Sequence, residues 1–316
     1  MSSRVPRPML ALDSSREREV HFSCPRCSES LLPLVKPQGL RCSNGHHIDL
    51  AREGYAYLMP SKRTKVSTAA LGPEADAMVR ASRAFCESGG FDQIATGVAS
   101  EVVRALSQYS RGTETAHVLA AGCADGFFLR HVAALLEAEQ PPSGGQPPVH
   151  FWGTDVSKLA VRYAARQQPS ARFAVASPHQ LPFADGSFDV VFSCFAPAPW
   201  GEFCRVLRPG GAVVVARAGH EHLQELRPLA GAPPWRASKE LSQGFGESYA
   251  RHRTVSTFTG QSAEHLLAMT PWTRNAPEAN QQALRDAMSN GLTTTFDLII
   301  TTHRVWLGTA NCEYEL

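Results

Sequence analysis

The feature that most constrains the fold of this chain is the alternation of short apolar segments with helical segments between His117 and Ala216. The apolar segments have the length of strands, and the segments between them show the apolar spacing of amphipathic helices. Strand, helix and strand in succession form a parallel pair joined by a crossover. The alternation therefore predicts an α/β fold with a doubly wound, Rossmann-like parallel sheet. The expected strands are His117–Ala121, His150–Thr154, Arg172–Ala176, Phe188–Ser193 and Ala212–Ala216, and the expected helices are Phe127–Glu139, Lys158–Gln167 and Trp200–Leu207.

Composition and the positions of Pro, Gly and polar segments divide the whole chain into four parts. Residues 1–21 are predicted to be a flexible lead, 22–60 a compact domain containing Cys and Gly, 61–107 a linker and helical connection, and 108–316 the main domain. The connection is expected to break at Gly89 and Gly90. In the last part, Ser262–Met269 is predicted as a helix, Phe296–Thr302 and His303–Leu307 as closing strands, and 219–260 shows little pattern.

Composition excludes several classes of protein. With 43% hydrophobic and 19% charged residues among 316, wholesale disorder is excluded. No apolar run reaches the roughly 18 residues of a membrane span. The N-terminus lacks the apolar core of a secretory signal, so a cytoplasmic protein is expected. Organellar targeting stays open, because the first seven residues contain two Arg and no acid. The net charge of +2 decides little about partners.

A second pattern is a pair of metal-binding motifs: Cys24-x2-Cys27 and, after fourteen residues, Cys42-x3-His46. Two such motifs together supply the tetrahedral thiolate and imidazole shell that zinc prefers. Because four protein ligands fill this shell, we expect a structural Zn2+ ion in a small N-terminal zinc-binding domain. His47 competes with His46 for the fourth position, and the spacing favours His46. A domain of about 40 residues also needs such a cross-link, since its own core is small.

A third pattern is the glycine-containing turn 122–126, between the first expected strand and its helix. Glycines there allow a ligand to approach the backbone closely. The turn lacks the G-x-G-x-x-G spacing of dinucleotide-binding proteins. Asp155 ends the next expected strand, where an acid can accept hydrogen bonds from both hydroxyls of a ribose. Gly122, Gly126 and Asp155 therefore predict a site for a nucleoside-bearing cofactor at the carboxyl edge of the sheet.

The ordered motifs resemble those of class I methyltransferases that use S-adenosyl-L-methionine (SAM). The zinc motifs joined to this pattern make the chain resemble the RlmA family, the 23S rRNA (guanine-N1-)-methyltransferases. The resemblance runs from about Phe22 to Trp306. The segments that match are Asp49–Tyr55, Leu58–Pro60, Arg83–Phe85, Gly89, Asp155–Lys158, Val175–Ser177, His179, Leu181–Asp189, Ala196-Pro197 and Arg205–Gly211.

The resemblance implies a fold, two cofactors and a partner. It implies SAM as the cofactor, large-subunit rRNA as the partner, no membrane association, and a homodimer. It also implies a methylation that lowers the binding of macrolide-type antibiotics. The family's zinc ligands fall on Cys24, Cys27, Cys42 and His46, and its cofactor contacts fall on Phe91, Ala124, Asp125 and His222.

The cofactor turn departs from the family pattern Asp-Ile-Gly-Cys-Gly-Glu-Gly. Ala120 replaces the acid, and Ala124 replaces a glycine, while Asp125 keeps an acid in the turn. Loss of the acid should weaken binding of the methionine end by roughly 1–3 kcal/mol. A positive φ at Ala124 would add strain. Two alternatives therefore stay open: an enzyme redirected to a small molecule, which the Pro-rich segment Ala230–Arg236 also suggests, and a catalytically impaired zinc- and RNA-binding relative.

Methyl transfer to guanine N1 requires removal of the N1 proton. A general base, or donors to the O6 atom, must assist this step. The candidate catalytic residues are Glu202 and His179, with His222 as a third. Each has a structural alternative: Glu202 can stabilise a helix start, and the histidines can bond to loops. RNA phosphates are expected to contact Arg26, Arg41, His47 and Arg52 of the zinc domain and the linker residues Lys62, Arg63 and Lys65.

Overall fold

The computed structural model describes residues 19–34, 39–59, 72–109, 115–139, 148–235 and 248–305. Residues 1–18 of the lead expected at 1–21, the linker residues Lys62, Arg63 and Lys65, and the chain from Trp306 onward lie outside the described residues. Within the described part, the largest sheet has eight strands in the order β11-β12-β10-β9-β6-β7-β8-β5. They are β5 (Ala56–Tyr57), β6 (Ala116–Ala121), β7 (Val149–Asp155), β8 (Arg172–Val175), β9 (Phe188–Cys194), β10 (Leu207–Ala218), β11 (Ser248–Phe258) and β12 (Leu292–Arg304).

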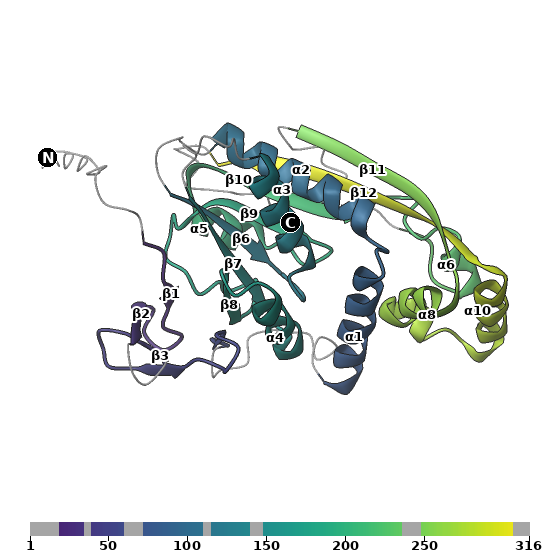
Figure 1. Cartoon of the computed structure of the whole chain (residues 1–316), viewed down its shortest axis with the longest axis horizontal. Coiled ribbons are helices and arrows are strands. Elements are labelled where there is room, and N and C mark those ends of the chain that lie inside the picture. Colours follow the sequence, from purple (N-terminus) through teal and green to yellow (C-terminus); the bar gives the residue numbers. More distant parts are fainter. Residues whose placement is uncertain are drawn as a thin grey trace, which may run out of the picture.

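The predicted parallel centre of the sheet is confirmed. Strands β10, β9, β6, β7 and β8 pair in parallel with one another in this order. Helices pack on both faces, as a doubly wound sheet requires (Figure 1). The helices are α1 (Pro73–Glu87), α2 (Asp92–Tyr109), α3 (Phe127–Glu139), α4 (Lys158–Gln167), α5 (Trp200–Val206), α6 (Leu226–Leu229), α8 (Gly260–Met269), α9 (Pro271–Arg274) and α10 (Glu278–Asn290).

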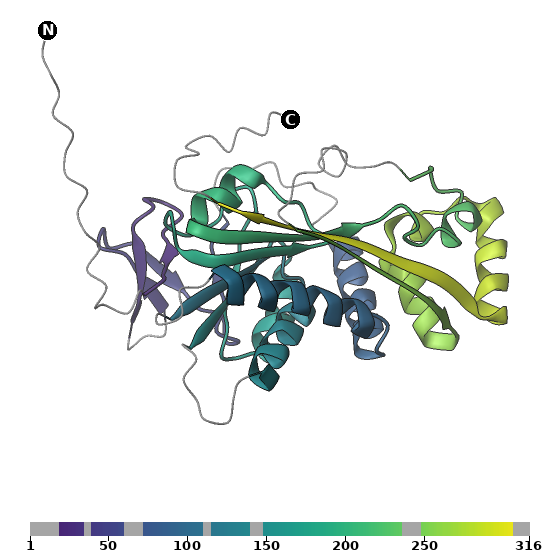
Figure 2. The ribbon, with the colours of Figure 1, turned by 90° about the horizontal axis from the view of Figure 1, so that it is seen from above.

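The C-terminal edge of the sheet differs from the prediction. The two closing strands expected at 296–302 and 303–307 form the single strand β12, because Thr302 and His303 both continue its antiparallel pairing with β10. The segment that showed little pattern contains β11, which pairs antiparallel with β12 along its whole length. The helix α10 was not predicted either. The long β11–β12 pair extends beyond the parallel centre to α6, α8 and α10 (Figures 1 and 2).

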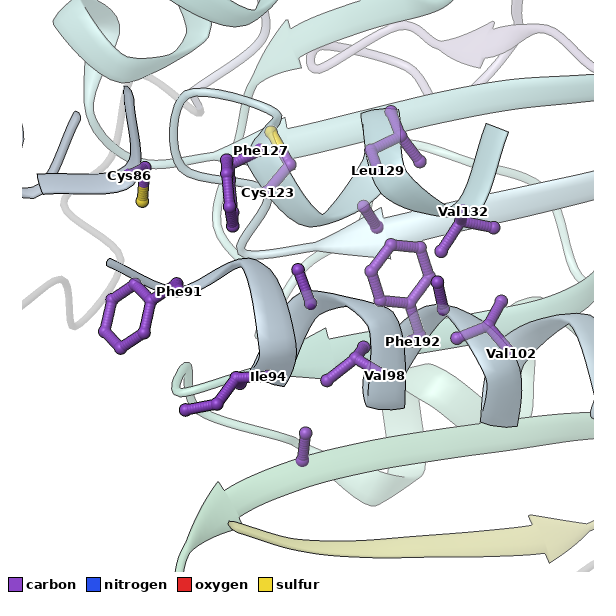
Figure 3. Packing of buried hydrophobic residues seen from close by; sticks show 14 of the residues in the cluster. Cys86, Phe91, Ile94, Val98, Val102, Cys123, Phe127, Leu129, Val132 and Phe192 are labelled. Carbon is purple, nitrogen blue, oxygen red and sulfur yellow. The ribbon is translucent and has the colours of Figure 1, made fainter. Parts of the chain in front are cut away.

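One of the two large hydrophobic clusters lies between α2, α3 and the sheet. Val98 and Val102, four residues apart on α2, share the helix face that meets Phe192 of β9 and Val132 of α3 (Figure 3). All four side chains are buried. Burial of such a side chain stabilises the fold by roughly 1.5–3 kcal/mol. This packing fixes the carboxyl ends of β6 and β9, from which the turn 122–126 and the segment after Cys194 emerge.

The N-terminal unit forms a small antiparallel sheet at one end of the molecule (Figure 2). Its strands are β1 (Phe22–Ser23), β2 (Ser30–Leu34), β3 (Gly39–Arg41) and β4 (His47–Asp49). The Phe22 ring lies 5.1 Å from the Trp152 ring and 5.3 Å from the Phe183 ring. The unit continues into β5, which joins the large sheet by parallel pairing with β8. The unit is therefore attached to the main sheet by side chains and by backbone.

None of the helices in the described ranges is both long enough and apolar enough to cross a bilayer.

Candidate functional site

The four expected metal ligands converge in the structure. Their ligand atoms lie within 4.8 Å of one another. The Nδ1 atom of His46 is 3.6 Å from the Sγ of Cys24, 3.3 Å from the Sγ of Cys27 and 3.5 Å from the Sγ of Cys42. Tetrahedral zinc, with bonds of about 2.3 Å to sulfur and 2.0 Å to nitrogen, separates its ligand atoms by roughly 3.5–3.8 Å. The donor set and its spacing therefore fit a structural zinc ion.

Two tight backbone turns bring these ligands together. In the first, the N–H of Ser28 donates to the carbonyl of Cys24. In the second, the N–H of Gly45 donates to the carbonyl of Cys42, and Gly45 has a φ of +79°, which favours glycine. The competing ligand His47 is not among the four clustered residues, and its Nδ1 is 3.4 Å from a carboxylate oxygen of Asp49.

The cofactor turn adopts left-handed backbone at three positions. The φ angles are +78° at Gly122, +48° at Ala124 and +81° at Gly126. A Cβ atom on Gly122 would lie 2.4 Å from the Cβ of Ala196, so only glycine fits there. The side chain of Ala124 is exposed, and its cost comes from the backbone conformation rather than from a clash. The turn therefore has the close approach expected at Gly122 and the strain expected at Ala124.

Asp155 is held at the carboxyl end of β7 by two backbone donors. Its Oδ2 atom accepts a hydrogen bond from the N–H of Ala124 at 3.0 Å, and its Oδ1 accepts one from the N–H of Ser157 at 2.8 Å. Burial raises the pKa of Asp155, while these N–H donors oppose the shift. Each carboxylate oxygen can accept two hydrogen bonds, so each retains capacity for a hydroxyl of the sugar. The same interactions lock the carboxylate to the turn.

Asp125 contains a buried acceptor without a hydrogen-bond donor. Its side chain is 7% exposed, and its Oδ1 accepts a hydrogen bond from the N–H of Phe127 at the start of α3. Among the described residues, no group donates a hydrogen bond to its Oδ2, although Arg130 lies 3.9 Å away. Burial raises the pKa of this carboxyl group. The orphaned oxygen fits a ligand with a positively charged group.

A cavity of about 210 Å³ lies beside this carboxylate. It is bordered by the cofactor turn, α1 and α8. Its lining residues are Met78, Val79, Ser82, Arg83, Ala124, Asp125 and Met269. The unsatisfied carboxylate and the bare backbone of the turn thus meet at a space that can admit part of a cofactor.

His222 lies in a turn after β10, and its tautomer is fixed. The backbone N–H of Asp297 donates to its Nδ1 atom at 3.4 Å. A backbone amide can only donate, so the proton of the neutral ring is on Nε2. Burial lowers the pKa of His222 to about 4. The structure also brings His222 and Phe91 to the same aromatic group, since their rings lie 5.8 Å and 5.2 Å from Phe296.

The two candidate bases lie in different surroundings. The Oε2 atom of Glu202 accepts a hydrogen bond from the N–H of Leu181 at 2.8 Å, and both its oxygens accept from Arg205. Glu202 lines a cavity of about 520 Å³ between the zinc unit and the main sheet, and the lining does not include the cofactor turn. His179 follows β8, and its ring is exposed. The structure therefore does not bring Glu202 to the turn.

Two residues of the site were not identified from the sequence. Asp297 has no exposed surface, and its Oδ2 accepts a hydrogen bond from the N–H of Glu221 at 3.0 Å, next to His222. Its signal was an acid between Phe296 and the apolar run 298–300. Phe195 follows β9, and its ring is 5.3 Å from that of His222. An aromatic residue directly after a buried strand was its only signal.

Comparison with known proteins agrees with this geometry. Residues 118–211 match a family described as "Methyltransferase domain", and residues 22–67 match one described as "RlmA, N-terminal". The "Putative 23S rRNA (guanine-N(1)-)-methyltransferase" of Micromonospora griseorubida is 32% identical, over 90% of this chain and 97% of its own length. The "23S rRNA (guanine(748)-N(1))-methyltransferase" of Streptomyces fradiae is 33% identical, over 79% of this chain and 85% of its own.

Proposed function

Because this chain belongs to the RlmA family of methyltransferases, we propose that it methylates N1 of a guanine in 23S rRNA. The strongest support is that two features occur together in this chain: a zinc-binding cluster, and a turn hydrogen-bonded to Asp155 at the carboxyl edge of a methyltransferase sheet. The first feature lies in the segment that matches the family's N-terminal model, and the second is what a SAM-dependent enzyme requires.

The residues of the turn would hold the cofactor in a defined position. SAM, when bound, supplies a methyl group on a positively charged sulfur. Asp155 would accept hydrogen bonds from its ribose, and the orphaned Oδ2 of Asp125 would accept one from its ammonium group. This carboxylate would offset part of the loss of the family's acid at Ala120. The remaining proposed contacts are Phe91, Gly122, Ala124, Gly126 and His222.

The chain must also assist removal of the guanine N1 proton. His222 is neutral at physiological pH because its pKa is about 4, and it offers an Nε2–H donor. This state suits a hydrogen bond to the developing charge on O6 rather than proton removal. Of the two candidate bases, the geometry favours His179, whose ring is exposed, over Glu202, whose carboxylate is engaged by Arg205.

The substrate determines the partner and the compartment that we propose. Arg26, Arg41, His47 and Arg52 are exposed on the zinc unit, where they would contact RNA phosphates. The site of action would be the cytoplasm, where ribosomal RNA is assembled and used. A homodimer, which the family resemblance implies, completes the proposal.

Methylation of unmodified 23S rRNA in the presence of SAM tests this function. We expect a primer-extension stop at a single guanine, because a methyl group on N1 blocks base pairing. The variant Asp155→Ala should abolish the stop, whereas Asp286→Ala, an exposed acid on α10, should not. Methyl transfer to small molecules without any stop in the RNA would favour a redirected enzyme. Absence of SAM binding at millimolar concentration in calorimetry would exclude both enzyme functions.

A further inference from the structure

Phe195 combines backbone strain with exposure. It follows β9 at the carboxyl edge of the sheet, its φ is +55°, and the residue is 41% exposed. A left-handed conformation is costly for a residue with a bulky side chain, and it persists only where the surroundings impose it. Here the N–H of Phe195 donates to the carbonyl of Ala216 at 3.0 Å, and the Ser193 hydroxyl donates to the carbonyl of Ala196. The chain thus holds an apolar ring at the surface.

The ring is supported by other aromatic residues. The ring of Phe91 is nearly parallel to it, with centroids 6.1 Å apart and an interplanar angle of 30°. Phe128 lies 6.4 Å away and His222 lies 5.3 Å away. These neighbours fix the orientation of the Phe195 ring while two fifths of the residue stays accessible.

This ring lies beside the cofactor turn. Ala196, the next residue, approaches Gly122 so closely that a Cβ on Gly122 would lie 2.4 Å from its own Cβ. A group stacked on Phe195 would therefore be adjacent to the turn that we propose for the cofactor. An acceptor for the methyl group must occupy this place.

We propose that Phe195 is the surface on which the target guanine stacks, with the Nε2–H of His222 directed to its O6 atom. The inference rests on the proposed function. A base in RNA becomes accessible to an enzyme when it leaves its stack, and aromatic side chains replace the lost stacking. Guanine has an acceptor at O6, whereas adenine has an N–H donor at the same position. A donor beside the ring therefore selects guanine over adenine.

The test compares Phe195→Leu, which keeps the apolar bulk, with Phe195→Tyr and Phe195→Trp, which keep an aromatic ring. Steady-state methylation of a 23S rRNA fragment gives KM and kcat, and calorimetry gives the affinity for SAM. We expect Phe195→Leu to raise the KM for RNA by roughly 10- to 100-fold, with SAM affinity within two-fold of wild type. Phe195→Tyr should keep the KM for RNA close to the wild-type value. Tyr249→Leu is the control, since Tyr249 is 64% exposed on β11.

Each contrary outcome has a distinct meaning. A Phe195→Leu enzyme with the wild-type KM would overturn the stacking role and leave the proposed function intact. A parallel loss of SAM affinity would show that the ring contacts the cofactor instead. Equal rises in the KM of Phe195→Leu and Phe195→Tyr would also overturn the stacking role, because an aromatic ring at this position would then not be sufficient. A folded wild-type protein that binds SAM but methylates no guanine in the RNA would overturn the proposed function itself, and this inference with it.

Discussion

Ala124 is the residue at which the cofactor turn is strained, with a φ of +48° and an exposed methyl group. Glycine adopts this conformation without the steric penalty. The relief of that penalty outweighs the entropic cost of glycine's greater freedom in the unfolded chain. We therefore predict that Ala124→Gly raises the free energy of unfolding by roughly 0.5–1 kcal/mol. Urea denaturation measures this. The control is Ala134→Gly at an exposed position inside α3, which should lower the same quantity by about 1 kcal/mol.

The buried ring of His222 predicts a pH dependence of stability. Its pKa is lowered to about 4 by burial, against 6.5 in an unfolded chain. Between these values the unfolded chain binds a proton that the folded protein does not, so stability falls as the pH falls. At pH 5 this should cost about 2 kcal/mol relative to pH 7.5. His222→Asn keeps an acceptor for the N–H of Asp297 but cannot titrate. Urea unfolding of both proteins should therefore show the extra loss in the wild type alone.

At the residue scale, the sequence predicted which residues bind ligands better than it predicted the surroundings of each side chain. The metal ligands and Asp155 follow from spacing, because their chemistry requires certain residue types at certain separations. The role of Phe195 does not follow from spacing. Its exposure and its positive φ depend on the carbonyl of Ala216 in β10, which lies 21 residues later in the sequence. The hydrogen-bond partners of Glu202 could be predicted only in part. Arg205 is one turn away on the same helix, but the N–H of Leu181 is brought to Glu202 by tertiary packing.

The β11–β12 pair contains an element-scale contact that positions the His222 turn. Burial alone would raise the pKa of Asp297 on β12, but hydrogen bonds from Arg251 on β11 and from the N–H of Glu221 hold it below its ordinary value. Arg251→Met would leave this carboxylate buried without its counter-charge, which is strongly destabilising. We predict that the unfolding temperature falls by several degrees. Arg253→Met is the matched control, because Arg253 pairs with Glu221 at the surface. Equal effects of both variants in calorimetry would contradict the prediction.

The same pair shows why one element escaped prediction from the sequence. The exposed positions of β11 include Arg251, Arg253 and Val255, and the alternate positions include His252 and Thr254. Neither face is apolar enough to show the alternation that marks a strand. The strand forms because β12 offers it a complete antiparallel edge and α2 covers its inner side, where Thr254 donates a hydrogen bond to Gln93. Elements of the parallel centre are buried on both faces, and their apolar character made them predictable.

For the whole molecule, the sequence indicated a separate zinc unit but not how firmly it is attached. A two-residue strand such as β5 has no periodic signal, yet it adds the zinc unit to the large sheet. The N–H of Ser23 donates to the carbonyl of Pro182 at 2.7 Å, and the N–H of Leu58 donates to that of Val175 at 2.9 Å. Contacts of this kind depend on the fold of both partners. They couple the metal to the β8–β5 edge of the sheet, and β8 in turn pairs with β7, whose last residue is Asp155.

Removal of zinc should therefore loosen one end of the molecule while sparing the cofactor turn. The metal is the main cross-link of a unit too small to fold alone, and β5 pairs with β8 at two residues. We predict that a chelator, or Cys27→Ser, raises amide exchange at Ala56 and Tyr57 by roughly 100-fold or more. Amides in β6, buried at the centre of the sheet, should exchange within a few-fold of their original rates, and SAM affinity should change less than two-fold. Hydrogen exchange with mass spectrometry and calorimetry measure these quantities, with Cys204→Ser on α5 as the control cysteine. Loss of SAM binding together with zinc would show instead that the metal stabilises the entire sheet, because Asp155 would then depend on the pairing between β7, β8 and β5.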